Sequence, residues 1–141
     1  MKKTMFVALA LICAYATSFA QSKTPDAVIK AFKDKFPTAT GVKWGKENAN
    51  EYEAAFMLKG SSYSASFNNT GGWLETESPL TFDQLPDKVQ NAFDASHKGA
   101  TVKAVAKIES AKGKTKYEIE LKQGTKTLEL FYNEDGTKAT E

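Results

Sequence analysis

The chain contains few side chains that could act as nucleophiles, general bases or metal ligands. Its 141 residues include one histidine, His97, and one cysteine, Cys13. Zinc, haem and iron–sulfur sites need several His or Cys ligands, and Ser–His or Cys–His catalysis needs a histidine beside the nucleophile. We therefore predict no catalytic residue, no metal site and no cofactor, and we expect His97 to be an ordinary surface or helix-capping residue.

Three pairs of glutamates have a spacing that could suggest acid–base chemistry. They are Glu51 with Glu53, Glu75 with Glu77, and Glu118 with Glu120. Residues two apart in a strand point to the same face, so each pair shares one face of a sheet. Lysines alternate with the last pair at Lys116 and Lys122. This pattern is typical of a water-exposed sheet surface, and we expect these carboxylates to be solvated.

Two short polar segments resemble calcium-binding loops only superficially. They are Asn68–Gly72 and Asn133–Gly136. Neither has the alternating Asp or Asn ligands and the terminal Glu of a calcium loop. We interpret both as turns between strands.

The charges of the chain balance almost completely. It has 19 Lys, no Arg and 17 acidic residues, and two of the lysines, Lys2 and Lys3, lie in the first 20 residues. Residues 21–79 then carry 7 Lys and 7 acids, and residues 80–141 carry 10 of each. Nucleic-acid binding draws on clustered cations and on Arg, so we exclude a nucleic-acid partner. Electrostatic steering to a polyanion or an acidic membrane is not expected either.

The first 20 residues have the pattern of a bacterial export signal. Two lysines precede an apolar run from Met5 to Ala16, and Ser18-Phe19-Ala20 offers small residues for cleavage before Gln21. The alternative of a membrane anchor needs about 20 apolar residues, and acylation at Cys13 as a lipoprotein lacks the small residue expected before the cysteine. We predict a signal peptide over residues 1–20, a periplasmic or secreted product, and no stable membrane insertion after cleavage.

From Gln21 onward the chain consists of two similar copies. At an offset of 61 residues the matches are Pro25 and Pro86, Asp26 and Asp87, Val28 and Val89, Ala31 and Ala92, and Phe32 and Phe93. Farther on the offset is 65, and the matches are Tyr52-Glu53 and Tyr117-Glu118, Phe56 and Leu121, Phe67 and Tyr132, Asn68 and Asn133, and Gly71 and Gly136. We predict a first repeat over residues 21–79 and a second over 80–141, together forming one domain.

Each copy begins with an amphipathic helix. In the first copy the apolar residues Val28, Ile29, Phe32 and Phe36 form one stripe, and Phe36-Pro37 ends the helix. Thr24 or Ser22 is the expected cap of the first helix and Asp83 that of the second.

The rest of each copy alternates apolar and polar residues with the period of a strand. The predicted strands are Val42–Trp44, Tyr52–Lys59, Ser62–Asn68, Trp73–Glu77, Thr101–Ile108, Lys116–Lys122 and Thr125–Tyr132. The period places on the inward, apolar face Tyr52, Ala54, Phe56, Leu58, Tyr63, Ala65, Phe67, Tyr117, Ile119, Leu121, Leu128, Leu130 and Tyr132. The other face is polar, so helices must cover the apolar one. We predict an α+β fold in which two tandem α-β-β-β(-β) repeats form one antiparallel sheet with the helices on one face.

These residues also resemble a known family. A Pro-opened helix ending in Phe, a Tyr-Glu-x-x-Phe/Leu strand and an aromatic-Asn-x-x-Gly turn occur in both copies. The pattern resembles that of the PepSY-like, beta-lactamase-inhibitor-like family of exported bacterial proteins. The resemblance implies one curved antiparallel sheet of the beta-lactamase-inhibitor-protein type, in which the concave face grips an enzyme. Because the motif is made of core and turn positions, it predicts a fold and transfers no function.

Aromatic and Met side chains on the polar face are the best candidates for a binding surface. Met57 and Phe131 lie on that face by period, Trp73 follows Gly71-Gly72, and a row of serines accompanies them at Ser62, Ser64 and Ser66. The alternative is that Trp73 packs at a repeat edge and Phe131 is covered by the other copy.

The expected function is a non-catalytic periplasmic protein that binds a protein or peptide partner through the open sheet face, with inhibition of the partner as one form of this. The alternative function is a carrier of a small or lipidic ligand held between the sheet and the helices. An enzyme is the weakest of the three classes.

Overall fold

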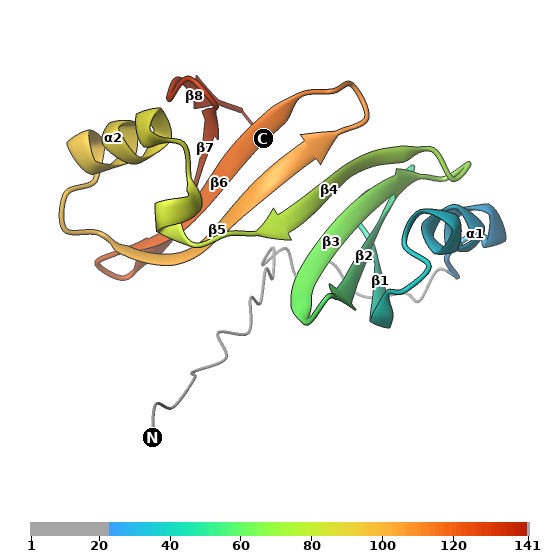
Figure 1. Cartoon of the computed structure of the whole chain (residues 1–141). Helices are drawn as coiled ribbons and strands as arrows, with labels where there is room; N and C mark the ends of the chain where they lie inside the picture. Colours follow the sequence, from blue (N-terminus) through green and yellow to red (C-terminus); the bar gives the residue numbers. More distant parts are fainter. Residues whose placement is uncertain (1–22, 141) are drawn as a thin grey trace.

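The computed structural model describes residues 23–140, so the signal peptide predicted for residues 1–20 lies outside the described residues. Eight strands form one antiparallel sheet in which each strand pairs with the next along the chain (Figure 1). The first half comprises α1 (Asp26–Lys35), β1 (Thr40–Lys46), β2 (Glu51–Leu58), β3 (Ser61–Asn68) and β4 (Trp73–Pro79). The second comprises a 3-10 turn, η1 (Phe82–Gln84), then α2 (Asp87–Ser96), β5 (Thr101–Ser110), β6 (Thr115–Gln123), β7 (Lys126–Asn133) and β8 (Lys138–Ala139).

The predicted fold class is confirmed, since the chain is an α+β protein with one antiparallel sheet and its helices on one face. The predicted strands lie within two residues of the observed ones at nearly every end, and β8 was not predicted. A two-residue strand is too short to show an alternation of apolar and polar residues. Within the described part of the chain, neither helix is long and apolar enough to cross a membrane.

The helix starts differ from the predicted ones. Pro25 and Pro86 are the N-caps of α1 and α2, and neither has a side-chain hydrogen bond. The cap expected at Thr24 is therefore wrong, and Ser22 lies outside the described residues. The cap expected at Asp83 is also wrong, because Asp83 is part of η1. Proline fixes the backbone ahead of each first turn, so the helix begins without a polar cap.

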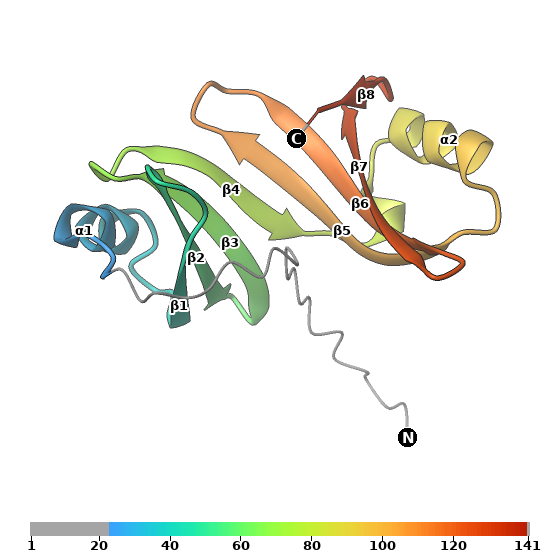
Figure 2. The same cartoon turned by 180° about the vertical axis from the view of Figure 1, so that it is seen from behind.

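The helices cover one face of the sheet, called here the covered face. The buried side chains that α1 and α2 contribute are Val28, Phe32, Val89 and Phe93. The strand residues that bury against them are Tyr52, Ala54, Phe56, Ala65, Phe67, Val105, Tyr117, Ile119, Leu121 and Tyr132. Apart from Val105, which was assigned no face, each of these residues lies on the side predicted from the strand period. Figure 2, from behind, shows the helices at opposite ends of the molecule.

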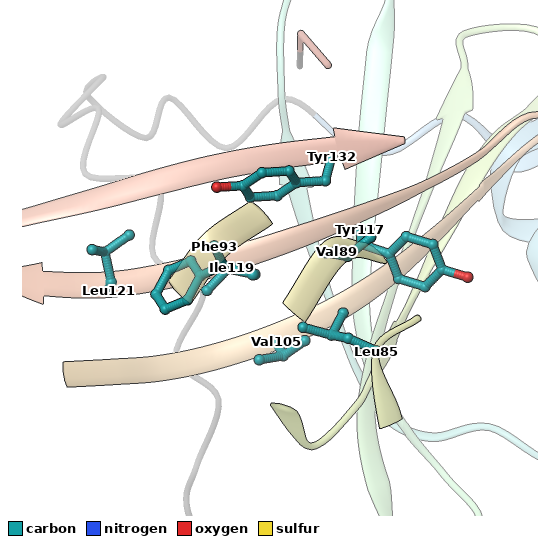
Figure 3. Close-up of a cluster of buried hydrophobic side chains, with 8 residues drawn as sticks. All are labelled: Leu85, Val89, Phe93, Val105, Tyr117, Ile119, Leu121 and Tyr132. Atoms are coloured by element: carbon teal, nitrogen blue, oxygen red, sulfur yellow. The ribbon is translucent and has the colours of Figure 1, made fainter. Parts of the chain in front are cut away.

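Each half has its own hydrophobic cluster. In the first half the ring of Phe32 lies 4.9 Å from Phe56, 5.4 Å from Phe36 and 5.4 Å from Trp44, measured between centroids. Burying one such ring contributes about 1.5–3 kcal/mol. The second cluster forms around Phe93, Ile119 and Leu121 and is mostly aliphatic (Figure 3).

A polar strip separates the two clusters on the covered face. The register pairs Thr76 with Glu109 and Ser78 with Lys107 across β4 and β5. The Ser78 hydroxyl donates to the Lys107 carbonyl at 3.3 Å, and the Lys107 ammonium lies 2.7 Å from a Glu109 carboxylate oxygen. The two halves are thus joined by strand pairing and polar contacts at this strip.

Two turns that contain glycine pack closely against the backbones of the helices. Gly71 follows β3 and Gly136 follows β7, both with positive φ, at 88° and 83°. A Cβ at Gly71 would lie 2.7 Å from the carbonyl oxygen of Ala27 in α1, and one at Gly136 would lie 2.5 Å from that of Lys88 in α2. The interpretation of both polar segments as turns is confirmed, and each turn sits directly against a helix backbone.

We predict that Gly136→Ala destabilises the protein far more than Gly113→Ala. Both glycines have positive φ, but a Cβ at Gly113 meets no atom within 4 Å. Gly113→Ala should cost about 1 kcal/mol through backbone strain alone. Gly136→Ala should cost about 2–4 kcal/mol, since α2 must also shift. Urea denaturation of the two variants measures the difference, and equal costs would show that the turn does not hold the helix.

Candidate functional site on the open sheet face

The face of the sheet opposite the helices is called here the open face. Its central residues follow from the strand register, since paired residues point to the same side. They are Glu53, Ala55 and Met57 in β2, Ser62, Ser64 and Ser66 in β3, Glu75 and Glu77 in β4, Ala106 and Ile108 in β5, Glu118 and Glu120 in β6, and Glu129 and Phe131 in β7. Serines and carboxylates therefore occupy the centre of this face.

The structure places five of the six predicted binding residues on the open face. Met57 is opposite Ser62 and is 41% exposed. Ser64 and Ser66 lie between strands β2 and β4. Phe131 is half-buried in the second half, with the Lys116 ammonium 5.6 Å from its ring centroid. Strands β3 to β6 lie between Met57 and Phe131, so these two apolar side chains do not form one patch.

Trp73 lies on the covered face and is not brought together with the other five. A bulge between Ser66 and Phe67 pairs Trp73 with Phe67, whereas Glu75 pairs with Ser66. Trp73 and Glu75 therefore point to opposite faces although they are two residues apart. The indole packs against the first hydrophobic cluster and donates its Nε1 hydrogen to Thr76 Oγ1 at 3.0 Å.

His97 occupies the C-cap of α2, as expected for a capping residue. Its backbone N–H donates to the Phe93 carbonyl, and its ring stacks on Phe93 with centroids 5.3 Å apart. His97 follows α2 on the covered side of the sheet, whereas the carboxylates described next project from the opposite face.

The glutamates of the open face are less exposed than predicted. Glu118 is only 4% exposed, and Glu77 has one carboxylate oxygen that is buried without a hydrogen-bond partner. The expectation that these carboxylates are solvated is wrong for these two residues. The strand period gave the correct face, but burial depends on side chains of neighbouring strands that the period does not reveal.

Three glutamates, Glu53, Glu75 and Glu77, lie around Ser64 and Ser66 on the open face. The Ser64 hydroxyl lies beside the carboxyl groups of Glu53 and Glu77 and partly offsets the rise in the pKa of each. Burial, with the negative charges of Glu53 and Glu75, raises the pKa of Glu77 to about 7. Burial also raises the pKa of Glu53, and the charges of Glu47 and Glu75 add to this. A positive partner group would relieve this repulsion, because it favours the charged form of each carboxyl.

The carboxylates line a hollow of about 490 Å³. Its floor comes from β2 to β5, and its rim from the β1–β2 loop at Glu47 and Asn48 and the β5–β6 turn at Lys112. A smaller hollow beside it shares Glu53 and Glu77 and includes Ser62 and Ser64. Within residues 23–140 no group of three or more His, Cys, Asp or Glu side chains is placed to hold a metal ion. The site offers hydrogen-bond acceptors and negative charge. The sequence placed these carboxylates on one face but interpreted them as a solvated surface, not as part of a site.

A family model described as "Putative beta-lactamase-inhibitor-like, PepSY-like" matches residues 50–138, well over half of the chain. The protein belongs to this PepSY-like family. The family resemblance seen in the repeated motifs is thereby confirmed. A search of curated proteins gives no match.

Solved structures with the same fold cover most of the chain. A DUF2874 family protein from Bacteroides ovatus is 28% identical, with a TM-score of 0.72 and coverage of 84% of this chain and 86% of the other. A BLIP-like protein from Bacteroides fragilis is 27% identical, with a TM-score of 0.69 and 86% coverage of both chains. A protein described as periplasmic from Bacteroides eggerthii reaches a TM-score of 0.76 at 24% identity, with 84% and 88% coverage, and shows the fold alone.

We predict that Glu77 makes the PepSY-like protein less stable as the pH rises. The folded protein holds the Glu77 proton more tightly than the unfolded chain does. The resulting stability is complete below the ordinary carboxyl pKa of 4.5 and is lost as the pH rises through about 7. Between pH 5 and pH 8 the free energy of unfolding of the wild type should fall by about 1–3 kcal/mol more than that of Glu77→Gln, whose side chain is neutral at both pH values.

Denaturant midpoints at the two pH values measure this difference. Asp94→Asn, an exposed residue of α2, is the control and should keep the wild-type slope. The same slope in Glu77→Gln as in the wild type would show that Glu77 is not the group responsible.

Proposed function

We propose that this protein is an exported, non-catalytic periplasmic binding protein that engages a protein or peptide partner through the open face. Export is supported by the pattern of residues 1–20, and the binding role by the family, whose description is beta-lactamase-inhibitor-like. The observation that carries the proposal is the carboxylate-lined hollow on a sheet face that neither described helix covers.

The charges of the open face favour a partner with a cationic segment. The acidic side chains on its strands are Glu51, Glu53, Glu75, Glu77, Glu118, Glu120 and Glu129, and the lysines are Lys43, Lys116 and Lys122. Around Ser64, burial and then the charges of the neighbouring carboxylates raise the pKa of Glu77. A Lys or Arg side chain placed in the hollow would gain charge-assisted hydrogen bonds and remove that repulsion.

A ligand held between the sheet and the helices is less well supported. Rings from α1, β1 and β2 approach to centroid distances of 4.9–5.4 Å around Phe32, which fills that space in the first half. Native mass spectrometry of protein purified from its own host distinguishes this alternative, since a reproducible small-molecule adduct would favour it.

We predict that Glu53→Gln/Glu75→Gln loses a partner that the wild-type protein captures from periplasmic extract. Removing two charges from the hollow should weaken the purified complex roughly tenfold, and higher salt should weaken the wild-type complex in the same direction. Quantitative mass spectrometry of the captured proteins followed by titration with the purified partner measures both effects. An activity assay of the captured protein shows whether binding also inhibits it.

The matched control is Asp34→Asn/Asp94→Asn, which removes the same charge from the exposed sides of α1 and α2. It should capture the same partner as the wild type. Met57→Ala/Phe131→Ala then tests the apolar part of the open face. Recovery of no specific protein, or equal recovery by the hollow variant and the control, would contradict the proposal.

A further inference from the structure

A second concave surface lies on the covered face, between α1 and the β5–β6 hairpin. It is called here the covered-face groove, and its volume is about 500 Å³. The lining comes from the end of α1, the β2–β3 turn, β4 and the β5–β6 hairpin. Figure 1 shows this hairpin running beside β4 toward the half of the molecule that carries α1. The groove lies between the two hydrophobic clusters, and Thr76, Ser78 and Glu109 of the polar strip line part of it.

The groove contains two aromatic surfaces that are fixed in place. The indole of Trp73 is oriented by its hydrogen bond to Thr76 and by the Lys35 ammonium, which lies 3.6 Å from the ring centroid. Tyr63 is half-buried and stacks on Phe56 with ring centroids 6.0 Å apart. Aromatic rings that are already held by neighbours lose little conformational entropy when a flat molecule packs against them.

The charge of the groove is positive. Lys35, Lys59 and Lys114 line it, and the only carboxylate among its described lining residues is that of Glu109. Glu109 already pairs with Lys107, whose ammonium lies 2.7 Å away. The groove therefore combines an apolar aromatic floor with ammonium groups at its edge.

We propose that the covered-face groove binds a small organic anion with a flat apolar body, such as an aromatic carboxylate. The ring would pack against Trp73 and Tyr63, and the carboxylate would pair with the ammonium groups of Lys35 and Lys114. An anion complements the groove because three lysines line it and its one carboxylate among the described lining residues, Glu109, already pairs with Lys107. A flat apolar body complements the rings of Trp73 and Tyr63. This site is on the opposite side of the sheet from the hollow and does not depend on the proposed function.

The test uses 2-naphthoate as the probe in isothermal titration calorimetry at low salt. We expect saturable binding of one naphthoate per chain. The neutral amide of the same ring should bind roughly tenfold more weakly, and the cationic 2-naphthylmethylammonium more weakly still, since charge pairing is lost and then reversed. Absence of saturable naphthoate binding, or equal binding of the cation, would overturn the proposal.

Two lysines of the β5–β6 hairpin give a matched pair of variants. Lys114 lines the covered-face groove, whereas Lys112 lines the hollow on the open face. Lys114→Gln should weaken naphthoate binding roughly three- to tenfold, as should Lys35→Gln, while Lys112→Gln leaves it unchanged. Trp73→Ala should abolish binding, with the thermal midpoint recorded to exclude unfolding. Equal effects of Lys112→Gln and Lys114→Gln would place any binding elsewhere and overturn the proposal.

Discussion

Burial of one phenylalanine per helix against the same side of the sheet is the contact on which the rest of the structure depends. Phe32 and Phe93 are both 3% exposed, and each is surrounded by strand residues of its own half. Because strand residues alternate, placing most of the large apolar strand side chains under the helices sends the alternate positions to the other side. The polar, carboxylate-rich character of the open face is therefore a direct consequence of how the helices are held.

Most of the fold could be predicted from the sequence because its signals are local and periodic. The two-residue period assigned Tyr52, Phe56, Ile119 and Tyr132 to the covered face, and the turns at Gly71 and Gly136 were identifiable from their residue types. Less of the candidate site could be predicted from the sequence. The side to which Trp73 points depends on a bulge in β4, where Leu74 is the extra residue, and the burial of Glu77 and Glu118 depends on neighbouring strands. The bulge and the burial cannot be predicted from the spacing of residues along one strand.

The two halves use corresponding positions differently. Phe36 and Phe67 in the first half correspond to His97 and Tyr132 in the second, where His97 Nδ1 and the Tyr132 hydroxyl are buried without a hydrogen-bond partner. A buried polar group without a partner costs about 1–3 kcal/mol. The first cluster is mostly aromatic and has Phe36 and Phe67 at these two positions, whereas the second carries this cost. Sequence similarity between two helix–sheet units thus coexists with unequal internal stability, and α2 is the helix we expect to detach first on unfolding.

The charges on the two sides of β4 affect how the protein approaches a charged neighbour. Glu75 and Glu77 of β4 project to one side of the sheet, while Lys35, Lys59 and Lys114 surround the other side of the same strand. Residues 21–141 contain 17 lysines and 17 acids, so the net charge is small although the two sides of β4 carry opposite charges. Such a molecule is not pulled toward a charged surface as a whole. The electric field of a charged neighbour instead favours one orientation of the protein, so that the side of opposite charge faces the neighbour.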